Sequence, residues 1–179
     1  MDQEAKKKKP DQAILKDLWS ADDKLVLQTI RKLRTTGNLT YIPDLLRLLG
    51  QAPNELVEKE LVRFLADIKE PGVIPLVVAG LQKPEGKPAL APILSAIWQS
   101  GLDYSKYMDL FIQLFLDGDY LVALESLTVI EQSMEHLGDE VLADTRNRLL
   151  AGLDRVSEDI KPLARDLVNR LQRWSSLVS

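Results

Sequence analysis

The stretch from residue 54 to residue 81 most constrains what this chain can fold into, because it predicts two helices joined by a tight turn. Its first half places apolar residues along one helical face: Val57, Leu61, Phe64, Leu65 and Ile68. Pro71 and Gly72 then interrupt the helix. Pro75 stands where a second helix would begin, a position that tolerates its missing N–H. One such pair cannot bury both apolar faces alone, so it needs neighbours of the same kind.

Those neighbours follow at a regular spacing. Leu33, Leu65 and Ile97 are separated by steps of 32 residues, and the dipeptide Ile-Pro at 42–43 recurs at 74–75. We therefore predict that Leu65 and Ile97 lie in the core between successive copies. The β-branched residues that follow Pro71-Gly72 would also suit a strand, but Pro75 argues against a central strand and the repeat register argues for a helix.

This register predicts about ten helices, with four consecutive pairs between end helices. Ser20 is the expected N-cap of the first long helix, which we expect to end at Gly37. Thr40 and Asp103 are expected to cap later helices, and Gly101 to end another. The predicted helices span residues 10–19, 21–37, 41–49, 54–68, 75–81, 88–101, 104–116, 120–136, 140–153 and 158–174. The last has a polar side that would seal an open end.

The termini and totals bound the class of protein. The chain has no cysteine and no apolar run of the roughly 20 residues that a membrane span needs. Four lysines precede Pro10, but charged residues follow where a signal peptide would be apolar. We expect a disordered basic tail at residues 1–9, a single domain at 10–179 and a cytoplasmic location, with no membrane partner.

Charge is distributed unevenly along the chain. Residues 88–145 contain ten acidic residues against Lys106 alone, a balance of −9. Residues 146–179 contain seven basic and four acidic residues, a balance of +3. An acidic surface would repel phosphate backbones and attract basic protein segments, or it would serve solubility only.

No residue pattern predicts catalysis. His136 is the only histidine, and a lone histidine rarely makes a transition-metal site without a second soft or imidazole ligand. No catalytic triad order, phosphate-binding glycine loop or metalloprotease motif is present in the sequence. We expect no enzyme activity, no catalytic residues, no cofactor and no bound metal.

The segment LADIKEPGVIPL at residues 65–76 resembles the signature of HEAT repeats, and LRTTGNLTYIP at 33–43 is similar to it. The resemblance covers roughly residues 20–153 and implies an all-α fold, a right-handed α-α superhelix or solenoid of about four helix pairs with end-capping helices. Val57 is followed by Glu58, and Ala89 by Leu90, where the family often has Val-Arg. Stacking is therefore expected to depend mainly on apolar contacts.

In HEAT-like solenoids the second helices of the pairs line the concave face, and the resemblance implies the same surface here. The candidate partner-binding residues on it are Asp44, Arg47, Asp109, Gln113, Asp144 and Arg148. We expect a protein–protein interaction module or scaffold whose partner is a basic protein or peptide.

Two alternatives come from other HEAT-like families, the alkylpurine DNA glycosylases and the phycobilin lyases. The first needs a basic groove for phosphates, which the acidic balance disfavours, so no nucleic acid is expected. No residue supports the second. The oligomeric state is left open.

Overall fold

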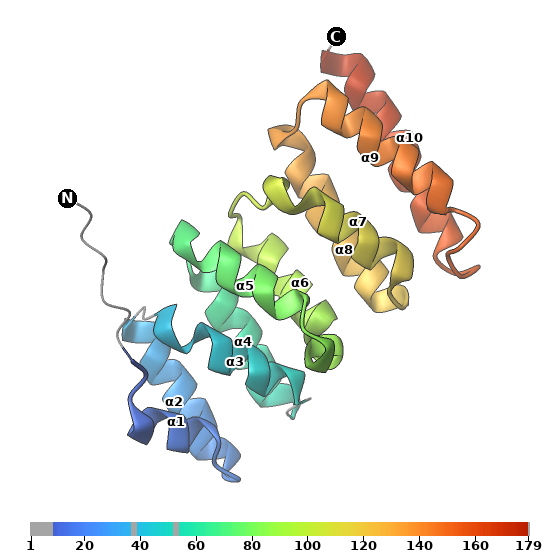
Figure 1. Ribbon diagram of the computed structural model, residues 1–179. Helices are drawn as coiled ribbons and strands as arrows, with labels where there is room; N and C mark the ends of the chain where they lie inside the picture. Colours follow the sequence, from blue (N-terminus) through green and yellow to red (C-terminus); the bar gives the residue numbers. More distant parts are fainter. Residues whose placement is uncertain (1–8, 37–38, 52–53, 179) are drawn as a thin grey trace, which may run out of the picture. The chain divides into compact units, whose positions relative to one another are not determined.

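The structure, a computed structural model, describes residues 9–36, 39–51 and 54–178. In these residues the chain is all-helical, with ten α-helices, five short 3-10 helices and no strand (Figure 1). This confirms the predicted all-α chain of about ten helices. The α-helices are α1 (Gln12–Leu18), α2 (Asp23–Thr36), α3 (Ile42–Gly50), α4 (Glu55–Asp67), α5 (Ile74–Leu81), α6 (Leu90–Ser100), α7 (Met108–Asp117), α8 (Tyr120–Ser133), α9 (Asp139–Gly152) and α10 (Lys161–Val178). The 3-10 helices are η1 (Leu39–Tyr41), η2 (Pro71–Val73), η3 (Pro84–Ala89), η4 (Ser105–Tyr107) and η5 (Met134–His136).

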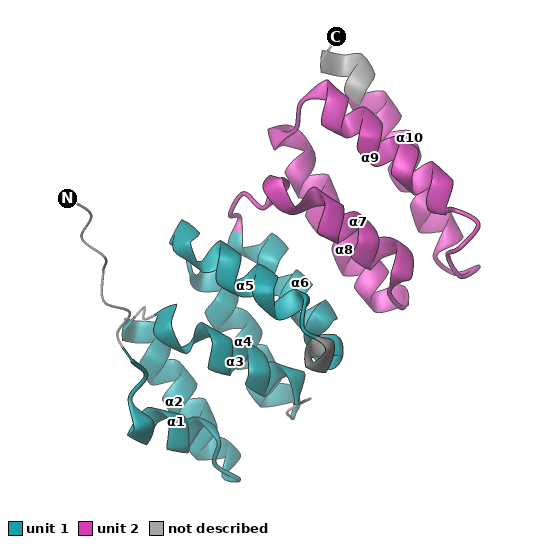
Figure 2. Cartoon of the chain, in the orientation of Figure 1, with its two compact units in different colours: residues 1–100 teal, residues 101–179 magenta. Residues whose placement is uncertain are grey.

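The chain divides into two compact units, Met1–Ser100 and Gly101–Ser179 (Figure 2). Unit 1 contains α1 to α6, and unit 2 contains α7 to α10. The division falls inside the third predicted helix pair, between α6 and α7. Of the predicted basic tail, only the exposed Lys9 lies within the described residues. That the chain forms a single domain at 10–179 stays a prediction.

Within unit 1, helices that are two places apart along the chain pack against each other. Helix α2 contacts α4, α4 contacts α6, and α3 contacts α5 (Figure 1). Leu65 on α4 and Ile97 on α6 are 4% and 3% exposed, and Leu33 on α2 is equally buried. The residues that recur at 32-residue steps therefore lie in the core along contacting helices, as the spacing predicts.

The start of each second helix repeats the same local structure. A 3-10 turn, η1, leads into α3 at Ile42, and the turn η2 leads into α5 at Ile74. Both helices have proline in the first turn. Backbone N–H groups there have no partner within the helix, so the missing N–H of proline costs no hydrogen bond. The turn η4 leads into α7 at Met108 in the same way. Ile42 and Ile74 thus occupy matching places, and residues 74–79 are helical rather than extended.

Unit 2 has a core between α7, α8, α9 and α10. Helix α7 contacts α8 and α9, and α10 contacts α8 and α9. Phe111 and Phe115 on α7 and Leu167 and Leu171 on α10 are fully buried. The apolar face predicted for the last helix is therefore used within unit 2, and α10 begins at Lys161 rather than Glu158.

Two helix starts differ from the prediction. The Ser20 hydroxyl accepts a hydrogen bond from the Asp22 N–H at 3.0 Å, and Asp22 Oδ1 accepts one from the Lys24 N–H at 2.9 Å. Helix α2 begins at Asp23, so Ser20 as its N-cap was wrong; the carboxylate two residues later takes that place. Asp103 caps the turn η4 through the Ser105 N–H rather than an α-helix.

Two helix ends bear on the predicted glycines. Gly101 follows α6 with a φ of 66°, the left-handed conformation that glycine adopts at low cost. The prediction for Gly101 is confirmed, whereas Gly37 lies outside the described residues.

Lys69 stabilises the ends of two contacting helices at once, because its ammonium donates to Ala66 O of α4 at 3.1 Å and to Ser100 O of α6 at 2.5 Å.

Polar contacts also join α2 to α4. Glu60 is buried on α4, and its carboxylate lies 3.5 Å from Arg31 and 3.6 Å from Arg34 of α2. Arg34 also pairs with Asp67 at the end of α4. The two guanidinium groups offset part of the cost of burying the Glu60 charge. Stacking in unit 1 therefore combines apolar contacts with an ion-pair network that the sequence pattern did not predict.

Candidate functional site

The six predicted partner-binding residues fall on second helices, but they divide between the two units. Asp44 and Arg47 lie on α3 in unit 1. The other four lie in unit 2, on α7 (Asp109, Gln113) and α9 (Asp144, Arg148). They are therefore two separate candidate surfaces, each described within its own unit.

Arg47 is held in place by two contacts. Its Nη2 donates to Asp44 Oδ1 at 2.8 Å, one helical turn earlier. Its guanidinium carbon lies 4.6 Å from the centroid of the Trp19 ring, a cation–π distance. The side chain is still 63% exposed. Arg47 thus presents a positioned guanidinium to solvent from the surface of α3.

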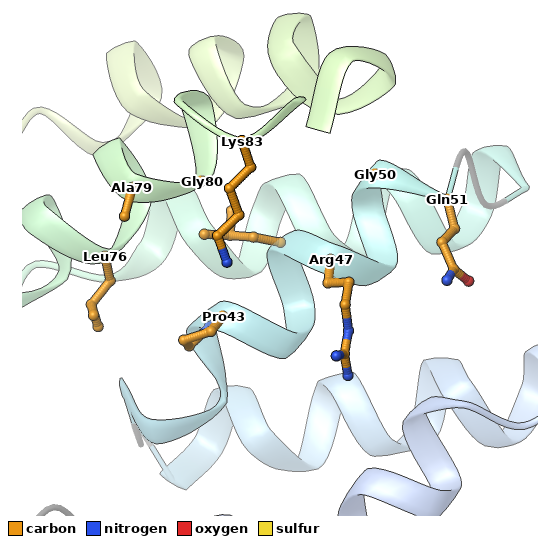
Figure 3. A pocket seen from close by; sticks show the side chains of 9 residues that line it. Pro43, Arg47, Gly50, Gln51, Leu76, Ala79, Gly80 and Lys83 are labelled. Carbon is orange, nitrogen blue, oxygen red and sulfur yellow. The ribbon is translucent and has the colours of Figure 1, made fainter. Parts of the chain in front are cut away.

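A groove of about 450 Å³ lies beside Arg47, between α3 and α5 (Figure 3). Figure 3 shows the Lys83 side chain extending toward α3 from the α5 side of the groove, where Leu76 also lies. Of the lining residues, Arg47 and Lys83 are charged and the others are not. The complete lining is Pro43, Leu46, Arg47, Gly50, Gln51, Leu76, Ala79, Gly80 and Lys83.

Small residues on α5 make room for this groove. Gly80 is buried, and a Cβ atom there would come within 2.8 Å of Leu46 Cδ1 on α3. Only a residue without a side chain allows this close approach without a shift. Ala79, the adjacent residue, is exposed and carries a single methyl group. The two helices therefore meet closely at Gly80 and leave open, apolar space next to it.

Lys83 gives the groove a second cation. It is exposed, and no carboxylate among the described side chains lies within ion-pair distance of its ammonium. Arg47, by contrast, already pairs with Asp44. The groove thus combines an apolar floor with two cations at its edges, of which Arg47 is ion-paired and Lys83 has no ion-pair partner among the described side chains.

The corresponding surface of unit 2 is bridged by charge. Arg148 of α9 pairs with Asp109 of α7 through Nη1 and Oδ1. Asp144 and Gln113 are exposed, and no ion pair to Asp144 is found among the described residues. Gly152 also lets α9 approach α7, because a Cβ there would lie 2.5 Å from Leu116 Cδ2. Asp109 is therefore a paired carboxylate, whereas Asp144 is exposed and has no ion pair among the described residues.

One carboxylate of unit 2 lies in a partly buried cluster. Glu131 of α8 lies 2.7 Å from Arg170 Nη1 of α10, close in distance but not aligned as a hydrogen bond. Arg170 also pairs with Asp166 at 2.7 Å. Burial raises the pKa of Glu131, Arg170 opposes this effect, and Asp166 adds to it. The charged form of Glu131 is thus disfavoured in the fold.

His136 forms no metal cluster in the described part of the chain. Its Nε2 lies 3.5 Å from Glu135 Oε1. Among the described residues, no group of three or more His, Cys, Asp or Glu side chains is placed to hold a metal ion. Within the same residues, the helices are all too short or too polar to cross a membrane.

The groove is the part of the surface that sequence reasoning missed. Arg47 was predicted, but Leu76, Gly80 and Lys83 were not. The recurrence of Ala-Gly-Leu at 79–81 and 151–153 was a usable signal, because both glycines face a leucine of the preceding second helix.

Comparisons with protein-family models, curated proteins and solved structures find no match to this chain. The resemblance to HEAT repeats therefore stays a prediction.

Proposed function

We propose that the chain is a HEAT-like, right-handed α-solenoid that binds a protein partner through its second helices and has no catalytic role. The order of packing within each unit supports the solenoid. In unit 1, α2 contacts α4, α4 contacts α6 and α3 contacts α5; in unit 2, α7 contacts α9 and α8 contacts α10. Alternate helices in contact are the arrangement that stacked helix pairs require. The recurring turns before α3, α5 and α7 support it as well.

The observation that carries the binding role is the groove between α3 and α5. Protein–protein binding energy concentrates where apolar anchors enter pockets edged by polar groups. The groove offers an apolar floor of that kind on a second helix. The titratable groups described above belong to ion pairs or stand singly, and no arrangement of them supports acid–base chemistry.

For unit 2 the proposed partner is a basic protein or peptide. This unit contains fourteen acidic and eight basic residues, a balance of −6. A surface of that sign attracts cationic segments over distances that shorten as salt rises. Asp144 is the predicted site residue best placed for the contact, since its carboxylate is exposed and Asp109 is already paired with Arg148.

Titration of a fluorescein-labelled Lys/Arg-rich peptide into the full chain tests this surface. Asp144→Lys should weaken binding several-fold, since it reverses an exposed charge, and added salt should weaken binding to the native chain. Asp154→Lys is the matched control, an exposed acid of unit 2 that lies after α9. Equal binding by both variants would contradict the proposal. Tight binding of duplex DNA at physiological salt would favour the nucleic-acid alternative instead.

A further inference from the structure

The floor of the α3–α5 groove suits the side chains of a peptide. Its volume of about 450 Å³ lies in the range of ligand pockets, roughly 300–1,000 Å³. Leu46 and Leu76 provide apolar walls, while Ala79 and Gly80 leave space between them. A bulky aromatic or aliphatic side chain would remove this apolar surface from water on binding. The floor therefore selects for an apolar anchor.

The edges of the groove select for negative charge beside that anchor. Lys83 has an exposed ammonium with no ion-pair partner among the described side chains. Across the groove, Arg47 is held in place by Trp19 and Asp44. A positioned guanidinium loses less conformational entropy on binding than a free one. Lys87, which is also exposed, follows in η3, and η3 packs against α3.

Charge also distinguishes between the peptide segments that could occupy the groove. The chain's own N-terminal segment is rich in lysine at residues 6–9, so the groove cations would repel it. An acidic peptide has the complementary sign. A helix with apolar residues at i, i+3 and i+4 and carboxylates beside them would match both the floor and the edges.

We propose that the groove between α3 and α5 binds an acidic amphipathic peptide segment of a partner protein. An apolar side chain of the peptide enters between Leu46 and Leu76, and a neighbouring carboxylate pairs with Lys83. The site rests on the proposed binding role of the second helices, but it lies wholly in unit 1 and takes a partner of opposite charge to that proposed for unit 2.

The test uses the full chain and a fluorescein-labelled helical peptide with one phenylalanine flanked by leucine and glutamate, followed by fluorescence anisotropy. Lys83→Glu should weaken its binding by about tenfold, the effect of about 1.4 kcal/mol. Ala79→Phe should abolish binding by filling the groove from an exposed position. Lys32→Glu on α2 is the matched charge reversal, since Lys32 is exposed and lies outside the groove. It should change binding by less than about twofold.

Three results would overturn the proposal. The first is binding of equal strength by a control peptide in which lysine replaces each glutamate. The second is no measurable binding, or an equal loss for Lys83→Glu and Lys32→Glu. The third is self-association of the chain that Lys83→Glu abolishes, because a second copy would then occupy the groove. Circular dichroism of each variant checks that it is folded. The basic peptide and Asp144→Lys report on unit 2 independently, so failure here and failure of the proposed function give different results.

Discussion

The second helices of unit 1 and unit 2 meet in different ways. In unit 1, α3 and α5 leave an apolar groove open between them, and Lys83 at its edge has no ion-pair partner among the described side chains. In unit 2, an ion pair between Asp109 and Arg148 joins α7 to α9 across the same kind of contact. Similar pairs of helices thus leave an open apolar groove in one unit and a surface bridged by an ion pair in the other.

A single position explains much of this difference. The residue four places before the glycine of the Ala-Gly-Leu triplet is Leu76 in α5 and Arg148 in α9. Residues four apart lie on one face of a helix, so both face the preceding second helix near the glycine. Leucine there lines a groove, whereas arginine reaches a carboxylate on α7. Changes at such positions alter binding chemistry while the helix packing stays the same.

Net charge strengthens the contrast. Unit 1 contains fifteen basic and thirteen acidic residues, whereas unit 2 contains eight and fourteen. All ten acidic residues of the stretch from 88 to 145 lie in unit 2. We therefore expect the two units to bind partners of opposite charge.

Core truncation in each unit should have the largest effect. Leu65→Ala and Ile97→Ala in unit 1 should each lower the free energy of unfolding by about 2–5 kcal/mol, because they leave cavities between contacting helices. Ile130→Ala on α8, which is fully buried, should cost a similar amount in unit 2. Urea denaturation followed by circular dichroism measures all three. A loss below about 1 kcal/mol at Leu65 or Ile97 would mean that the repeat register is wrong.

The two close-approach glycines should respond unequally to alanine. At Gly80 the new methyl would meet only the tip of Leu46 within 3 Å. The helix preference for alanine, about 1 kcal/mol, offsets that contact, so Gly80→Ala should leave the unfolding free energy within about 1 kcal/mol of native. At Gly152 it would meet both methyls of Leu116, at 2.5 and 2.7 Å. Gly152→Ala should therefore cost about 1–3 kcal/mol.

Thermal denaturation of the two glycine variants side by side gives the comparison. Equal melting temperatures would show that α9 approaches α7 no more closely than α5 approaches α3. A larger loss for Gly80→Ala would reverse the contrast.

A smaller effect is expected for the pH dependence of stability that Glu131 of unit 2 causes. Burial raises the pKa of Glu131 in the fold, so the folded chain holds its proton at pH values where the unfolded chain has released it. The resulting stability is fully present below the unfolded pKa, about 4.3, and is lost as pH rises through the folded value. Glu131→Gln should therefore flatten the fall of the melting temperature above about pH 4.3. Glu140→Gln, at an exposed carboxylate of the same unit, is the control against which the slope is compared.

Periodic apolar residues were enough to predict the all-α fold, the burial of Leu65 and Ile97, and, to within one residue, the helix starts at Ile42 and Ile74. These features depend on local preference and on a 32-residue spacing that is visible in the sequence. The Glu60 network and the groove were not predicted, because both depend on side chains of different helices that only the packing brings together. For the same reason the sequence did not predict that two of the candidate partner-binding residues, Asp109 and Arg148, pair with each other across 39 residues.

The opposite binding preferences proposed for the two units can be tested in one set of titrations. Isothermal titration calorimetry would compare the acidic, phenylalanine-containing peptide and the Lys/Arg-rich peptide on the native chain, Lys83→Glu and Asp144→Lys. We predict that Lys83→Glu weakens binding of the acidic peptide alone and that Asp144→Lys weakens binding of the basic peptide alone. Loss of both peptides with either variant, or of neither peptide with both, would contradict the assignment of opposite partners to the two units.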